Sequence, residues 1–150
     1  MTQEPSHRPA PPLAVLDTNV VLDWLVFRDP RVESVVAAIR TGRLGWISCP
    51  AMRQELAHML AHRQLSAWSP DLDGSLAEHD RHARLQPDPP PLTEARPRCS
   101  DADDQVFVDL ALSHRASWLF THDRALLRLA RRLRPWRLEV CPPAAWAGAD

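Results

Sequence analysis

The chain has 150 residues, of which 45% are hydrophobic, and a formal net charge of -1. This length supports one domain with an ordinary core, and the near-zero charge excludes a globally basic polyanion-binding protein. No apolar run approaches the roughly 20 residues that span a bilayer. Residues 1–12 are polar and rich in proline, which predicts a flexible tail and not a signal peptide. We therefore expect a cytoplasmic protein with no membrane segment.

The predicted elements of the first half alternate between strands and helices. They are a strand at Leu13–Leu16, a helix at about 19–27, a helix from Pro30 to Arg40, a strand at Leu44–Ile47 and a helix from Pro50 to about His62. Asp29 stands in the N-cap position before Pro30, which is a favourable helix start. Ser48 can cap the helix that begins at Pro50.

The second half contains a segment without a clear pattern. A helix at Leu72–Leu85 is conceivable, but Pro70 and Gly74 disfavour it. Gln86–Arg98 has five prolines in 13 residues, which predicts an extended loop. Order returns at Ser100, which can cap a helix running to His114 with Asp103 at its third position. The remaining predicted elements are a strand at Ser117–Thr121, a helix at Arg124–Leu133 and a strand at Arg137–Cys141.

This alternation predicts a parallel α/β sheet, whose sites form outside the carboxyl ends of the strands. Asp17 follows the first strand directly, and Asp123 lies two residues past the strand at Ser117–Thr121. Both are expected at the same edge of the sheet, where the start of the helix that carries Asp104 could also lie. Carboxylates repel one another, so their convergence indicates a divalent cation.

Four segments resemble, in the right order, the motifs of PIN-domain ribonucleases. They are 16–22 around Asp17, 48–56 around Glu55, 99–111 around Asp104, and 121–127 around Asp123. The resemblance covers about residues 13–146 and implies a PIN-like three-layer α/β/α sandwich with a central, mainly parallel sheet. The subgroup that it resembles most is the toxin components of bacterial toxin–antitoxin systems. The Gln86–Arg98 loop departs from this pattern, because relatives usually have another strand and helix there.

The resemblance also implies roles for individual residues. The catalytic set is Asp17, Glu55, Asp104 and Asp123, with Asn19 and Thr121 as supporting residues. Asp17, Asp104 and Asp123 are the expected metal ligands, and Glu55 would orient or deprotonate the attacking water. Asp101 could replace or assist Asp104, and the sequence leaves this choice open.

The residue types favour a hard metal ion. Oxygen ligands without a cysteine partner suit Mg²⁺ or Mn²⁺, which activates water for attack on a phosphodiester and neutralises charge on its oxygens. A histidine face is the competing metal hypothesis, since Glu55, His58 and His62 share one side of a helix and His79 and His82 are three apart. No His-Glu-x-x-His motif accompanies it, so a solvated or partly buried face is the better interpretation.

All 18 basic residues are arginines, and seven of them lie between Arg115 and Arg137. Genome-wide composition bias and a solvated helix face are the preferred explanations, and phosphate recognition through bidentate guanidinium groups is the alternative. Arg124 and Arg128 are the candidates for RNA contact beside the acidic site. His122 adjoins Asp123 and is a candidate for phosphate contact, not for metal binding.

The leading hypothesis is a metal-dependent endoribonuclease that acts as a toxin and is inhibited by an antitoxin protein. RNA is then the substrate, and a homodimer is possible because relatives commonly dimerise. The alternative is a non-catalytic RNA- or protein-binding module that retains the fold.

Overall fold

The computed structural model describes residues 9–90 and 97–146, and it contains one five-stranded sheet in which every pair of neighbouring strands is parallel. The order is β3-β2-β1-β4-β5. The strands are β1 (Leu13–Leu16), β2 (Gly45–Ser48), β3 (Arg84–Leu85), β4 (Trp118–Phe120) and β5 (Glu139–Cys141). The predicted α/β fold with a central parallel sheet is confirmed.

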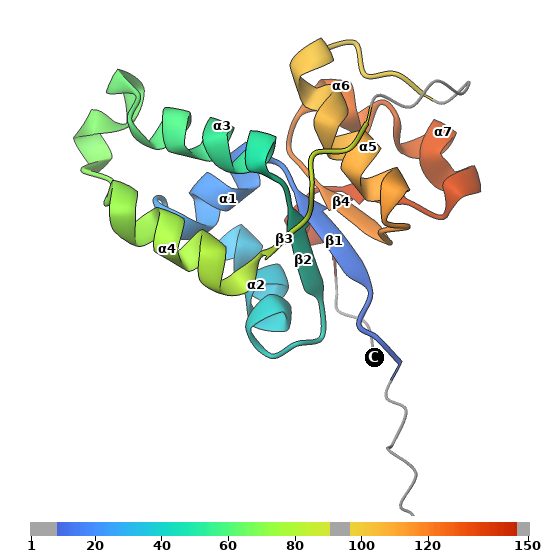
Figure 1. The fold of residues 1–150 in the computed structure, drawn as a ribbon, viewed down its shortest axis with the longest axis horizontal. Coiled ribbons are helices and arrows are strands. Elements are labelled where there is room, and N and C mark those ends of the chain that lie inside the picture. The colour runs from blue at the N-terminus through green and yellow to red at the C-terminus, as the bar shows by residue number, and fades with distance from the viewer. Residues whose placement is uncertain (1–8, 91–96, 147–150) are drawn as a thin grey trace, which may run out of the picture.

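Helices cover both faces of this sheet, which makes three layers (Figure 1). One layer consists of α1 (Thr18–Leu25), α2 (Glu33–Arg40), α3 (Pro50–Leu60) and α4 (Leu72–His82). The other consists of α5 (Gln105–Ser113), α6 (Arg124–Leu127) and α7 (Ala130–Leu133). No helix in these described ranges is long and apolar enough to cross a membrane.

The alternation of side chains along the strands divides the core into two parts. Leu16 and its register partner Phe120 pack in the cluster under α1–α4. Val15 and its partner Leu119 face the opposite way, into the cluster under α5–α7. All four side chains are at most 1% exposed, so β1 and β4 are buried on both faces. Such strands form the rigid centre of a parallel sheet.

The connections reverse direction between β1 and β4. From β1 the chain adds β2 and then β3 on one side, and it later returns to add β4 and β5 on the other side. The carboxyl ends of β1 and β4 therefore form a topological switch point, where open parallel sheets place their ligand crevices. In Figure 1 this edge lies between α3 and α5, which contact each other across it.

The predicted Ser48 cap of α3 is wrong. Ser48 is the last residue of β2, and its buried Oγ lies 2.9 Å from Nε2 of His79 in α4. Cys49 occupies the N-cap position instead. The Asp88 carboxylate instead accepts a hydrogen bond from the Ala51 N–H (2.9 Å). The orphan donor at the start of α3 is thus satisfied from a distant loop.

The middle of the chain also differs from expectation. The helix at Leu72–Leu85 exists but ends at His82, and Arg84 and Leu85 form β3 beside β2. Residues 86–90 and 97–98 of the expected loop have no regular structure, and 91–96 lie outside the described residues. Most of the expected tail at 1–12 lies outside them too. Pro12, which is described, accepts a hydrogen bond from the Gly45 N–H (2.9 Å).

Three predictions near the end of the chain need correction. Asp101, not Ser100, caps the turn Ala102–Asp104 by accepting a hydrogen bond from the Asp103 N–H (3.0 Å), and α5 begins only at Gln105. The single helix at Arg124–Leu133 is two short helices, because a tight turn from Leu129 N–H to the Leu126 carbonyl (3.0 Å) interrupts it. The strand predicted at Arg137–Cys141 begins only at Glu139, and Arg137 before it has a left-handed conformation with φ of 59°.

Candidate active site

Asp17 lies at the centre of the candidate site because it ends β1 and begins α1. Its backbone N–H continues the sheet by donating to the Phe120 carbonyl (3.1 Å). Its carboxylate Oδ1 caps α1 by accepting from the Asn19 N–H (2.7 Å) and the Val20 N–H (3.2 Å). An N-cap aspartate at a strand end is common, so these contacts alone do not define a site.

Thr121 joins Asp17 to Asp123. Its fully buried hydroxyl donates to Oδ2 of Asp17 and accepts a hydrogen bond from the Asp123 N–H (2.9 Å). Asp123 in turn caps α6, since its Oδ1 accepts from the Ala125 N–H (2.7 Å) and the Leu126 N–H (3.3 Å). One hydroxyl therefore fixes both acids at the ends of β1 and β4.

We expect Thr121→Val, which has the same shape but no hydroxyl, to destabilise the protein by about 1–3 kcal/mol. The reason is that it leaves a buried carboxylate oxygen and the Asp123 N–H without their partner. Thr121→Ser keeps the hydroxyl and is the matched control, with a smaller loss from the missing methyl group. Urea unfolding at pH 7 measures both. Equal losses for the two variants would show that the hydroxyl bridge contributes little.

Two further acids reach the same edge from opposite helical layers. Asp104 stands immediately before α5, and Glu55 lies in the middle of α3. A cavity of about 170 Å³ brings all four acids together; it is lined by Asp17, Thr18, Asn19, Glu55, Met59, Asp104, Phe107 and Asp123. The four acids, which are spread over more than 100 residues of the sequence, thus line one cavity.

The electrostatics of the cavity disfavour negative charge. Burial, supported by the carboxylates of Asp123 and other nearby acids, raises the pKa of Asp104 to about 7. Burial also raises the pKa of Asp17, although the hydrogen bonds from Thr121, Val20 and Asn19 oppose it. The pKa of Glu55 is raised chiefly by burial, against a hydrogen bond with the Thr18 side chain. Buried like charges of this kind need a compensating cation or protons.

The other predicted residues lie around this cavity in different ways. Asn19 lines it, whereas Thr121 lies behind it as the bridge described above. Asp101 is exposed and does not line the cavity, but its charge raises the pKa of both Asp104 and Glu55. Arg124 and Arg128 are exposed on and after α6 and lie outside the cavity lining.

Sequence reasoning missed two contacts near the site. Thr18 stands between Asp17 and Asn19, and its side chain bonds Glu55, so it connects the first motif to α3. His122 pairs with Asp23 of α1, with Nε2 and Oδ2 3.0 Å apart. The position of Thr18 inside the first motif was a signal for the former, but nothing in the sequence connects His122 to Asp23.

The donor set suits a hard divalent cation. Among the residues that the structure describes, every ionisable group lining the cavity is a carboxylate, and no arginine or histidine lines it. Residues 9–90 and 97–146 contain no group of three or more His, Cys, Asp or Glu already in a metal-binding arrangement. Mg²⁺ keeps several waters and needs few direct carboxylates, so this set fits it.

The fold and the site together define a class of protein: a parallel α/β domain with an acidic cavity at the switch point of its sheet. Comparison with known families matches residues 14–125, which include all four acids, to the PIN domain. The chain therefore belongs to the PIN-domain family, whose members are commonly metal-dependent nucleases. A search of curated proteins found no match.

Proposed function

We propose that this protein is a metal-dependent endoribonuclease that hydrolyses RNA phosphodiester bonds in the cytoplasm. The observation that carries the proposal is the convergence of Asp17, Glu55, Asp104 and Asp123, from four separate elements, on one cavity at the switch point of the sheet. Membership of the PIN-domain family supports a nucleic-acid substrate.

In this proposal Asp17, Asp104 and Asp123 hold Mg²⁺ or Mn²⁺. A bound ion supplies charge neutralisation at the phosphodiester and activation of water. Asp104 is favoured over Asp101 as the third ligand because it lines the cavity while Asp101 does not. Deprotonating Asp104 near neutral pH is costly in the free protein, and a bound cation would remove that cost.

The remaining residues position the reactants. Glu55 orients or deprotonates the attacking water, and its raised pKa makes it a stronger base than an ordinary glutamate. Thr121 supports the first and fourth acids through its bridging hydroxyl, and Asn19 supports the first through its backbone N–H. Arg124 follows Asp123 directly, and Arg128 lies one turn further on, where exposed guanidinium groups can contact RNA phosphates.

The test is incubation of the purified wild-type protein with RNA in Mg²⁺ or Mn²⁺ and, in parallel, in EDTA. We expect internal cleavage only with the metal. The second candidate is a non-catalytic PIN-fold module that binds RNA or protein. RNA binding without metal binding or cleavage would favour that module and contradict the nuclease.

We further propose that the nuclease is the toxin of a toxin–antitoxin pair and can form a homodimer. The resemblance of the acidic motifs to such toxins supports this role. Expression of the protein alone is then expected to arrest bacterial growth. Co-expression of a small protein from a neighbouring reading frame is expected to restore growth. Unimpaired growth together with RNA cleavage in vitro would retain the nuclease and contradict the toxin.

A further inference from the structure

A second cavity lies at the edge of the sheet opposite the acidic site. Ser117 and Arg137 belong to its lining, and they precede β4 and β5, whereas Asp123 follows β4. The volume is about 480 Å³, within the range of small-molecule sites. The described residues that line it are Ala111, Leu112, Arg115, Ala116, Ser117, Trp136 and Arg137. This cavity is distinct from the one that holds the four acids.

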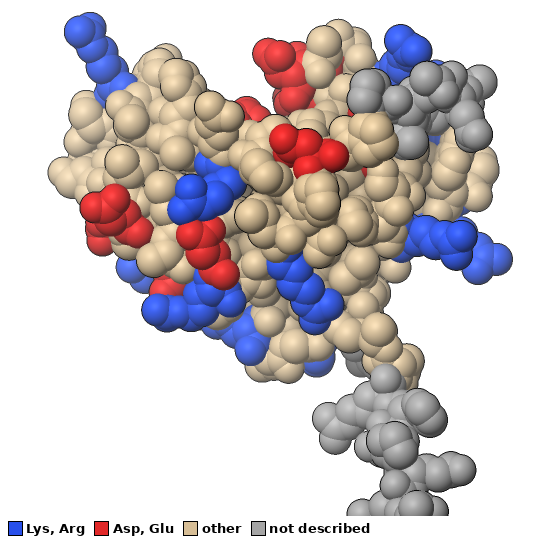
Figure 2. Space-filling model, viewed as in Figure 1, with Lys and Arg blue, Asp and Glu red and all other residues tan. Residues whose placement is uncertain are grey.

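The charged side chains that line this cavity, among the described residues, are all positive. Arg115 and Arg137 line it, no acid does, and neither guanidinium forms an ion pair with any residue in 9–90 or 97–146. The nearby end of α5 does not offset this charge fully, because the Leu112 and Ala111 carbonyls already accept from Arg115 (3.3 Å) and Ala116 (2.8 Å). Figure 2 shows basic side chains, and no acidic ones, at the lower right beside the α5–α7 layer.

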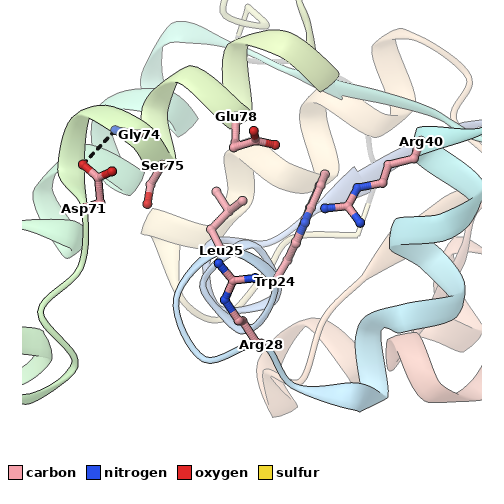
Figure 3. A pocket seen from close by; sticks show the side chains of 8 residues that line it. All are labelled: Trp24, Leu25, Arg28, Arg40, Asp71, Gly74, Ser75 and Glu78. Carbon is pink, nitrogen blue, oxygen red and sulfur yellow. Dashed lines mark hydrogen bonds between the residues drawn. The ribbon is translucent and has the colours of Figure 1, made fainter.

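A third cavity differs from this one because both basic and acidic side chains line it. Figure 3 shows Arg28 and Arg40 on one side of a cavity of about 360 Å³ and Asp71 and Glu78 of the α4 segment on the other. The Arg40 guanidinium there lies 5.8 Å from the ring of Trp24. Its arginines thus have acids or an aromatic ring nearby, and no such partner is present for Arg115 and Arg137 within the described residues.

Arg115 and Arg137 share an uncommon backbone conformation. Both are in the left-handed region, with φ of 53° at Arg115 and 59° at Arg137. Arg115 follows the C-cap of α5, and Arg137 is the C-cap of the turn Arg134–Trp136. Glycine or asparagine is the usual choice at such helix ends, because the Cβ atom of most other residues crowds the backbone there. Arginine stands at both positions, and both line the same cavity.

Trp136 supplies an aromatic surface in the same cavity as these two arginines. The residue is 44% exposed, and its ring contacts neither another ring nor a guanidinium within the described ranges. An indole can stack on any base, and flanking arginines can hold the adjacent phosphate. One open ring, together with two guanidinium groups that have no ion-pair partner among the described residues, matches a nucleotide better than an inorganic anion.

We propose that this cavity binds one nucleotide unit, with its base stacked on Trp136 and its phosphate held by Arg115 and Arg137. The unit can be a free mononucleotide or one residue of an RNA strand, and the strand version rests on the proposed ribonuclease function. In that case the strand would be held at both edges of the sheet, and the arginine-rich segment 124–134 would lie between the two sites in sequence.

The test measures binding of a fluorescein-labelled hexauridylate by anisotropy, in EDTA so that no metal-dependent cleavage occurs. Trp136→Ala is expected to weaken binding by at least about fivefold, and Trp136→Phe to retain most of it, since a base stacked on an aromatic ring contributes a factor of this size. The double variant Arg115→Asn/Arg137→Asn keeps residues that tolerate the left-handed backbone. We expect it to weaken binding and to reduce the slope of log K against log salt by about 0.7 for each lost phosphate contact.

The matched control is Arg28→Asn/Arg43→Asn. It removes the same charge at exposed positions, and Arg28 has the same left-handed backbone, with φ of 50°. Binding like that of the wild type is expected. Unfolding curves of all variants verify that they are folded, and equal weakening by the control and the pocket variants would overturn the proposal.

Competition with 5′-UMP identifies the source of the nucleotide. Displacement of the hexamer at equal molar concentration supports a free mononucleotide, whereas tighter binding of the hexamer by tenfold or more supports a strand. Failure of the wild type to bind either ligand would overturn the proposal, as would pocket variants that bind like the wild type. A wild type that cleaves RNA while the pocket variants bind normally would reject this site and retain the nuclease. Loss of binding in these variants, with no RNA cleavage by the wild type, would retain this nucleotide site and reject the nuclease.

Discussion

The Asp17→Asn and Asp123→Asn variants are expected to lose metal-dependent RNA cleavage by at least about 100-fold, since even residues behind metal ligands commonly contribute 10- to 100-fold. Asparagine has the size of aspartate, and its amide oxygen can still cap α1 or α6. The change therefore removes a negative charge from the cavity and retains the local structure. Initial rates of cleavage in Mg²⁺ or Mn²⁺ measure the effect.

Asp71→Asn is the matched control for these variants. Asp71 is also an N-cap residue, accepting from the Gly74 N–H (3.0 Å) at the start of α4, but it lies outside the acidic cavity. Its cleavage rate is expected to equal that of the wild type. If Asp17→Asn and Asp123→Asn also cleave at the wild-type rate, the assignment of the catalytic acids is wrong.

Asp104→Asn is expected to increase the stability of the metal-free protein, whereas removing a residue from a site usually lowers stability. The pKa of Asp104 is raised from 3.8 to about 7 in the folded protein, so the folded state holds the proton more tightly than the unfolded chain does. Stability therefore falls as the pH rises from about 4 to 7, and the loss is complete above that range. In EDTA at pH 8 the variant should melt above the wild type, by on the order of 3 °C. At pH 4 the two should melt together.

At pH 8, Mn²⁺ should change the order of the melting temperatures of the wild type and Asp104→Asn. A cation that binds the folded wild type stabilises it, and the variant lacks one of the proposed ligands, so its gain should be smaller. Asp101→Asn, at an exposed position outside the cavity, is the control and should shift the melting temperature little at either pH. Identical pH profiles for wild type and Asp104→Asn would contradict the electrostatic account of the cavity.

The parts of the fold that sequence predicted best are those governed by local chemistry. Leu13–Leu16 is an apolar run, and the structure contains a strand with these same bounds. Because Asp17 follows that strand and Asp123 follows β4, the rule for parallel sheets placed both acids at one edge. The structure shows them lining one cavity there. Glu55 and Asp104 could not be selected by this rule and came from the family resemblance.

The missed features depend on contacts between distant segments. Asp88 satisfies the start of α3 from 37 residues away, so the nearer Ser48 looked like the cap. Ser48 instead faces the buried ring of His79, a contact that only the packing of α4 against β2 creates. β3 is two residues long, too short for a periodic pattern, and its position depends on pairing with β2. Tertiary contacts decided each of these cases, and local propensity could not reveal them.

The most direct test of the account is a calorimetric titration of Mn²⁺ into the wild-type protein and into Asp17→Asn. We expect saturable binding to the wild type and a loss of affinity of at least about tenfold in the variant, because the central carboxylate of the site is removed. We also expect tighter binding as the pH rises through about 7, where Asp104 loses its proton. Absence of binding to the wild type, or equal binding to both proteins, would contradict a metal site built on these four acids.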